Sequence, residues 1–157
     1  MKKQEFRVDS PGTYEYILPF DTDNEEGDLL GVIEARTPGE YDIKVMVSHK
    51  AIGTRARVAI RGVVENGARV KLVGLVKIGK RAKDTDSFLG LKLLMLDNKS
   101  YALAEPELEI LNNEVKASHS ASVGRISKEQ LFYLASRGIG EMEAKELIVE
   151  GFLMNIN

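Results

Sequence analysis

The stretch that decides the fold runs from Pro106 to Phe152 and reads PELEILNNEVKASHSASVGRISKEQLFYLASRGIGEMEAKELIVEGF. It begins as a polar, strand-like segment, passes through a loop of serines and other small residues, and ends in two short helices. Ser127 followed by Gln130 is a capping-box pattern, and Gly138 supplies the left-handed residue that ends the first helix. Each helix has only about ten residues, too few for stability alone in water, so we expect both to dock on a β-rich body.

The second helix is expected to begin near Gly140. Ala144, Leu147 and Ile148 share one face at helical spacing, and Gly151 is a suitable terminator. We therefore expect residues 1–124 to form the β-body and residues 125–157 a C-terminal helical region.

The first hundred residues have the sequence pattern of β-structure. Short apolar runs alternate with turn residues, and Pro19 is expected to stop the first run. The expected strands cover residues 14–18, 29–35, 41–47, 57–64, 69–79 and 87–96, and the acidic stretch Asp21 to Asp28 reads as a solvated loop. Asn66-Gly67 by itself favours a two-residue hairpin. This pattern fits an all-β sandwich, a barrel or a solenoid, and no clean repeat period selects among them.

Composition describes one ordinary globular domain, with or without a small appendage. The chain has 157 residues, 29% of them charged, a net charge of −2 and no cysteine. Without cysteine it forms no disulfide and offers no thiolate to a metal. The N-terminus lacks the apolar core of a secretory signal, and no apolar run reaches the ~20 residues of a membrane-spanning helix, so we expect a cytoplasmic protein.

The net charge hides an asymmetry along the chain. Residues 50–100 contain 12 basic and 4 acidic residues, whereas residues 1–49 contain 5 basic and 11 acidic ones. The basic segment 50–83 indicates one of two things. It forms an anion-binding face, or its charges lie on outer faces of strands and pair with neighbouring acids, which is the more common arrangement.

The C-terminal stretch contains short sequence motifs, here called words, that resemble those of the SufB/SufD family, the scaffold components of Suf iron–sulfur cluster assembly. That family usually reads PELEI, NN, VK, CSHGATVG, LFYL, SRGI and EGF, and the chain keeps most of these words between Pro106 and Phe152. A weaker similarity extends over roughly residues 49–104, and residues 1–48 are not placed by the resemblance. The resemblance implies a mainly β fold: a parallel β-helix, or solenoid, of short strands with a small C-terminal helical hairpin. It also implies that the helices dock on SufC, an ABC-type ATPase, and that the β-cores pair into dimers.

The departures from the family words limit what the chain does. Ala117 stands where the family often has cysteine, Ser120 stands where it has glycine, and the chain is far shorter than typical members. Iron–sulfur clusters are held mostly by thiolates. We therefore expect a SufD-like member that binds no cofactor alone, with a cluster possible only when a partner contributes ligands.

His119 is the sharpest candidate for chemistry. It matches the family's Ser-His position, and neutral imidazole is a good ligand for iron or zinc. A lone histidine is more often structural, hydrogen-bonded to backbone in a turn. His49 is the only other histidine, and a site made from histidines alone needs the two to converge. Glu105, Glu107 and Glu109 alternate along the chain and suggest a row of carboxylate ligands. The more common explanation is that they form the solvated side of a strand that buries Leu108 and Ile110.

The helical end carries large side chains typical of binding hot spots. The candidates for partner binding are Phe132, Tyr133, Arg137, Glu150 and Phe152. The alternative is that these groups complete a small core between the helices and the β-body. We expect Leu131, Leu134, Leu147 and Ile148 to face inward and the candidates to face a partner.

No catalytic or nucleotide-binding motif is present. Ser118, Ser120 and Ser122 surround His119 without a nucleophile elbow, and no glycine pattern fits a Walker loop or a dinucleotide site. The leading expectation is a non-enzymatic SufD-like adaptor that joins a SufC-like ATPase to a SufB-like partner or to a second copy of itself. The alternative is a polyanion- or nucleic-acid-binding β-module that uses residues 50–83. An enzyme acting on acidic sugars, suggested only by the basic stretch from Lys77 to Lys83, ranks last.

Overall fold

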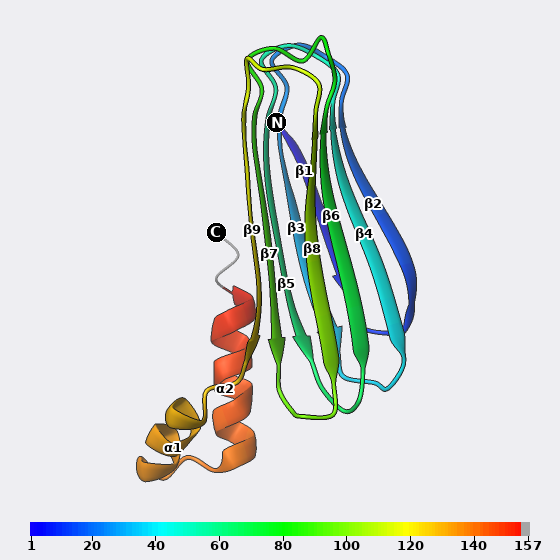
Figure 1. Cartoon of the computed structure of the whole chain (residues 1–157). Helices are drawn as coiled ribbons and strands as arrows, with labels where there is room; N and C mark the ends of the chain where they lie inside the picture. Colours follow the sequence, from blue (N-terminus) through cyan, green and yellow to red (C-terminus); the bar gives the residue numbers. More distant parts are fainter. Residues whose placement is uncertain (155–157) are drawn as a thin grey trace.

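The computed structural model describes residues 1–154, which form nine β-strands followed by two helices (Figure 1). The strands are β1 (Lys2–Val8), β2 (Gly12–Phe20), β3 (Glu26–Ala35), β4 (Glu40–His49), β5 (Arg55–Val64), β6 (Arg69–Ile78), β7 (Asp86–Met95), β8 (Tyr101–Ile110) and β9 (Lys116–Arg125). The helices are α1 (Lys128–Ser136) and α2 (Glu141–Met154).

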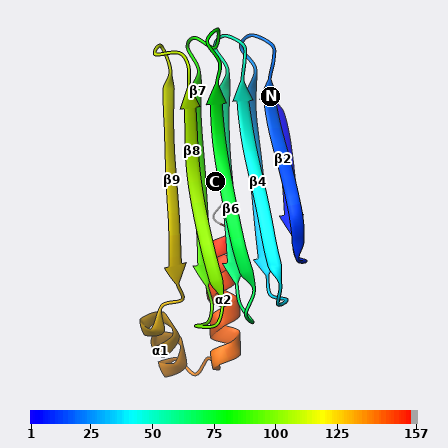
Figure 2. The ribbon, with the colours of Figure 1, turned by 45° about the vertical axis from the view of Figure 1, so that its right-hand side comes forward.

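Consecutive strands alternate between two parallel sheets. One sheet has the order β1-β3-β5-β7-β9 and the other β2-β4-β6-β8, and every neighbouring pair is parallel. The chain therefore winds through about four turns of a β-solenoid, each turn contributing one strand to each sheet (Figures 1 and 2). This confirms the solenoid implied by the family resemblance.

The turns repeat at a nearly constant length that the sequence does not reveal. Glu26 pairs with Arg55, 29 positions later, and Arg69 pairs with Tyr101, 32 positions later. What recurs is the side on which a residue faces, not its identity. A repeat of this kind contains no recurring sequence motif, so a comparison of the sequence with itself does not detect it.

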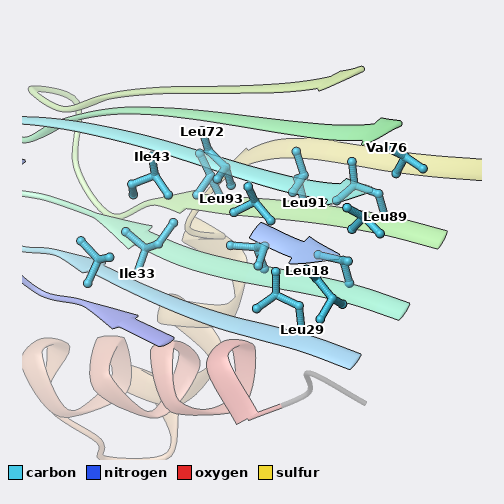
Figure 3. Close-up of a cluster of buried hydrophobic side chains, with 14 of the residues drawn as sticks. Leu18, Leu29, Ile33, Ile43, Leu72, Val76, Leu89, Leu91 and Leu93 are labelled. Carbon is cyan, nitrogen blue, oxygen red and sulfur yellow. The ribbon is translucent and has the colours of Figure 1, made fainter. Parts of the chain in front are cut away.

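The interior is a stack of aliphatic side chains from both sheets (Figure 3). Strands alternate between buried and solvent-facing positions, as the β6 sequence RVKLVGLVKI illustrates. Alternate residues therefore face the core, which has space for only one side of each sheet. Fully buried members of the stack include Leu29, Ile33, Ile43, Leu72, Val76, Leu89 and Leu91.

Two local expectations about the turns were wrong. Asn66 and Gly67 do adopt positive φ, at 59° and 79°, but they join β5 to β6 in opposite sheets and make no hairpin. Pro19 does not end its strand, because it lies within β2 and is in register with Ser48. β2 is an edge strand, where proline is tolerated because one side has no neighbour to receive an N–H.

The ends of α1 follow the sequence signals closely. The Ser127 hydroxyl accepts a hydrogen bond from the backbone N–H of Gln130 at 3.2 Å. At the other end Gly138 has φ 83°, and its N–H and that of Ile139 donate to the carbonyls of Ala135 and Leu134. This is a Schellman motif, which satisfies carbonyls left free by the helix.

Helix α2 is longer than expected and is the helix that packs on the solenoid. It continues through Gly151 to Met154, so Gly151 does not terminate it. Val149 is buried with Val63 and Leu96 in a second apolar cluster on the outer side of the five-stranded sheet. α1 packs on α2 and has no buried residue. Within residues 1–154, neither helix has the length and apolarity needed to cross a bilayer.

Candidate functional site

His119 lies on the last strand of the solenoid and not in a loop. It is in register with Leu89, a fully buried residue of β7, so its side chain is on the interior-facing side of β9. No turn follows β9 in its sheet, and His119 is consequently exposed. The loop expected around it was wrong because a strand of small polar residues at a sheet edge lacks the apolar alternation of a buried strand.

The last turn leaves one end of the solenoid open. We call this surface, formed by β8 and β9, the open end. Both strands have a neighbour on one side only, so each presents a row of backbone groups without a strand partner. The interior-facing positions of the open end, read from the register with β6 and β7, include Ala102, Ala104, Pro106, Leu108, Ile110, Ala117, His119, Ala121 and Val123.

The structure does not bring the two histidines into one site. His49 is fully buried, with Nδ1 2.7 Å from the Thr54 hydroxyl and Nε2 3.1 Å from the Ser87 hydroxyl. Its ring also stacks on Phe20. Burial lowers the pKa of His49 to about 4, so the ring is neutral near pH 7. Both ring nitrogens already have partners, and His49 is a structural histidine of the core.

No complete metal site exists among residues 1–154, where three or more histidine or carboxylate side chains nowhere converge. The row Glu105, Glu107 and Glu109 lies on the outer face of β8, opposite to the side of His119. Glu109 forms an ion pair with Lys77 of β6 at 3.7 Å. His119 is therefore not part of a group of three such side chains within the described residues.

The basic segment pairs with acidic residues of adjacent turns. Seven of the ten cations between residues 50 and 83 form ion pairs with other turns. The pairs are Lys50–Asp21, Arg55–Glu26, Arg57–Asp86, Arg69–Glu40, Lys77–Glu109, Arg81–Asp23 and Lys83–Glu114. Because most of its charge is compensated locally, this segment makes a poor polyanion-binding face, and the arrangement disfavours that alternative.

An ionic cluster fastens α2 to the solenoid. Arg36 binds Glu65 at 2.8 Å and Glu146 of α2 at 2.7 Å, and Lys145 of α2 binds Glu65 at 2.8 Å. The hydrogen bond from Arg36 lowers the pKa of Glu146, and the same bond raises the pKa of Arg36. We call these four residues the clamp. Arg36 and Glu146 are 110 positions apart, and nothing in the sequence indicates this pairing.

The five partner-binding candidates take different positions. Phe132 is 77% exposed and Tyr133 56% exposed on α1, and the guanidinium of Arg137 lies over the Tyr133 ring. Glu150 is exposed on α2. Phe152 is half-buried beside the second apolar cluster. Arg61 of β5 lies over its ring and donates to its carbonyl at 2.9 Å.

The inward-facing set needs one correction. Leu131, Leu134 and Ile148 are half-buried, but Leu147 is 46% exposed. Met142 of α2 is 85% exposed and was not among the candidates. The apolar surface of the helical end is therefore larger than the sequence indicated, because the periodicity of a short helix does not say which neighbour covers its face.

Comparison with known proteins gives a consistent result. The profile of the family described as "SUF system FeS cluster assembly, SufBD core domain" matches residues 14–152. A Staphylococcus aureus (strain USA300) protein named "Iron-sulfur cluster assembly SufBD family protein" is 37% identical over 128 residues, or 82% of this chain and 28% of that protein. A Staphylococcus epidermidis protein of the same name matches with the same identity and coverage. The chain spans less than a third of the length of these curated relatives.

Proposed function

Because the chain belongs to the SufB/SufD family of iron–sulfur cluster assembly proteins, we propose that it is a non-enzymatic, SufD-like scaffold that docks a SufC-like ABC ATPase through its helical end. The observation that carries this proposal is the exposure of Phe132 and Tyr133 on α1, a helix that follows β9 directly and packs against α2. Aromatic side chains in such positions are typical anchors of protein interfaces.

The clamp supports a mechanical role for the helical end. α1 supplies the exposed aromatic surface, α2 connects it to β5, and the clamp links α2 to two successive turns. A partner that moves α1 during ATP binding and hydrolysis therefore pulls on the solenoid itself. In this proposal the chain binds no nucleotide and transmits movement that the ATPase generates.

The open end is the proposed surface for a SufB-like partner or a second copy of the chain. Unpaired strands recruit strands from other proteins, since each added strand satisfies backbone donors and acceptors. His119 lies within this surface, so a partner bound there is positioned to complete a ligand set around an iron–sulfur cluster, which is cargo and not a resident cofactor. Without thiolates of its own, the chain contributes one imidazole and relies on the partner for the remaining ligands.

Co-purification with a SufC-like ATPase tests the docking proposal. We expect the double variant Phe132→Ala/Tyr133→Ala to lose the ATPase, because each aromatic anchor typically contributes about 2 kcal/mol or more to binding. Thermal unfolding should be unchanged, since both side chains are exposed.

Tyr101→Ala is the matched control, since this residue is a similarly exposed aromatic on β8. It should retain the ATPase. Full ATPase recovery with the double variant would reject docking through α1.

A further inference from the structure

The outer face of the five-stranded sheet contains a groove to which the functions proposed above for the helical end and the open end assign no role. Its volume is about 450 Å³, and its lining includes residues from all five strands of the sheet. Strands about 4.8 Å apart make such a groove about 19 Å long, the span of about six residues of extended peptide. The groove therefore runs across the strands, parallel to the solenoid axis.

The floor of the groove is made of small or aliphatic side chains at a single level of the sheet. Leu30, Ala59, Gly90 and Ser120 occupy successive positions in the strand register from β3 to β9. Phe88, which is 37% exposed, stands beside the floor on β7. Bulkier residues on either side and small ones between them produce the depression.

Charge is distributed unevenly along the groove. Arg57, Arg61 and Lys92 surround the half formed by β5 and β7, which contributes no acidic residue to the lining, whereas Glu5 and Asp28 outnumber Lys3 in the half formed by β1 and β3. The Lys92 ammonium has no ion-pair or hydrogen-bond partner within residues 1–154. Arg57 shares its guanidinium with Asp86 at 3.1 Å, and Arg61 holds the last turn of α2. One half of the groove thus attracts acidic groups and the other does not.

We propose that this groove binds a short extended acidic segment of a partner protein. A carboxylate of the segment faces the unpaired Lys92, and its apolar side chains lie on Leu30, Ala59 and Phe88. The narrow apolar floor favours a peptide with alternating side chains, because one side of an extended chain faces the floor and the other faces solvent. The mixed charge of the groove disfavours nucleic acid, since a uniform polyanion would place phosphates against Glu5 and Asp28.

The opposite sheet provides a matched comparison. Lys71 of β6 is also an exposed mid-strand lysine on an outer face, with no ion-pair partner among the described residues. Val73 of the same strand is half-buried on that face, as Ala59 is on β5. Neither residue lines the groove, so changes at Lys71 and Val73 control for effects on charge and on sheet stability.

The test is an unbiased selection of peptides on the full chain. A phage-displayed random heptapeptide library is selected on the wild-type chain and counter-selected on Ala59→Phe, which fills the floor. We expect enriched peptides to contain acidic residues alternating with apolar ones. Anisotropy of a labelled enriched peptide then gives its affinity. Lys92→Glu should weaken binding about tenfold or more, whereas Lys71→Glu and Val73→Phe should leave it unchanged.

Three results would overturn the proposal. One is the recovery of no peptide that distinguishes the wild type from Ala59→Phe, and another is enrichment of peptides without acidic residues. The third is a labelled oligothymidylate that binds with the same dependence on Lys92, which would identify a nucleic-acid site. If Ala59→Phe does not fold, the comparison of Lys92→Glu with Lys71→Glu decides the question alone.

Discussion

The two ends of the solenoid are built differently. At the first turn, the rings of Phe6 and Tyr16 stack with centroids 3.7 Å apart over the interior. Gly31 makes room for them, because any side chain there would collide with Phe6. At the open end, the interior-facing positions include four alanines, Ala104 and Ala117 among them, and no aromatic ring. Both ends have unpaired strand edges, but the first turn covers its core with aromatic rings, whereas the last turn leaves interior-facing side chains such as His119 and Ala121 exposed.

The difference also separates the two histidines. His49 is sealed inside the stack next to Phe20, with both nitrogens bonded to hydroxyls. His119 lies at the open end with no such partners among the described residues. The same residue type is structural where the solenoid is closed and is available to a partner where it is open.

The largest expected effect comes from protonating His49. Its folded-state pKa of about 4 is below the ordinary value of 6.5, so the unfolded chain binds this proton first. The free energy of unfolding should therefore fall as the pH decreases from about 6.5 towards 4, by about 3 kcal/mol in all. Urea unfolding at successive pH values measures this slope.

Two variants isolate the contribution of His49. His49→Gln should remove the slope between pH 6.5 and 4.5, and His119→Gln should retain it. The carboxyls of Glu25, Asp86 and Glu146 have lowered pKa values and titrate below this range. An identical slope in the wild type and His49→Gln would show that another group is responsible.

Truncation of the aromatic cover should destabilise the closed end. Phe6→Ala removes the ring that fills the space over Gly31, and we expect the free energy of unfolding to drop by about 2 kcal/mol, because the ring is half-buried. Val123→Ala at the open end should cost under about 1 kcal/mol, since Val123 is 40% exposed. Equal costs in denaturant titrations would contradict the distinction between the ends.

The clamp should make a smaller contribution. Arg36→Met removes two of its ion pairs, and a partly exposed network of this kind is expected to contribute about 1 kcal/mol. Hydrogen exchange should show faster opening of α2 with little change in the β-strands. Protection of α2 equal to that of the wild type would mean that the apolar cluster around Val149 holds the helix without the clamp.

The smallest effect on stability, with the clearest effect on assembly, is expected at the open end. Ala121→Glu places a carboxylate on an exposed interior-facing position and should change the free energy of unfolding by less than about 0.5 kcal/mol. It should abolish pairing with a SufB-like partner or a second copy, because pairing would bury the charge without a counter-ion. Sedimentation of the mixed proteins checks this, and undiminished complex formation would exclude the open end as the interface.

Local signals in the sequence predicted local structure well. The Ser127 cap and the Gly138 terminator were confirmed because their hydrogen bonds lie within one helical turn. The positive φ expected at Asn66 and Gly67 was also confirmed, although the hairpin was wrong. A turn residue determines the direction of its own backbone, whereas the strand that pairs with a given strand lies about 30 residues away in the sequence.

The candidate site shows the same difference between local features, which the sequence predicts, and contacts between turns, which it does not. The match to the family motif singled out His119 as a candidate. Its position on an edge strand is known only from the structure, in which β9 pairs with β7. The clamp and the groove depend on residues from different turns and leave no sequence pattern. From the sequence, the basic segment 50–83 was either an anion-binding face or a set of cations paired with neighbouring acids. Only the stacking of turns about 30 residues apart shows that most of them are paired.

By itself, the sequence determined the β-rich class, the capped helical hairpin, the absence of thiolates and the family, because each is written in neighbouring residues or in matched words. The tertiary structure alone decided which residues meet across turns: the sealed His49, the exposed His119, the clamp on α2 and the two unlike ends. In a solenoid every contact between turns joins residues far apart in the chain, and such contacts exist only once the turns are stacked.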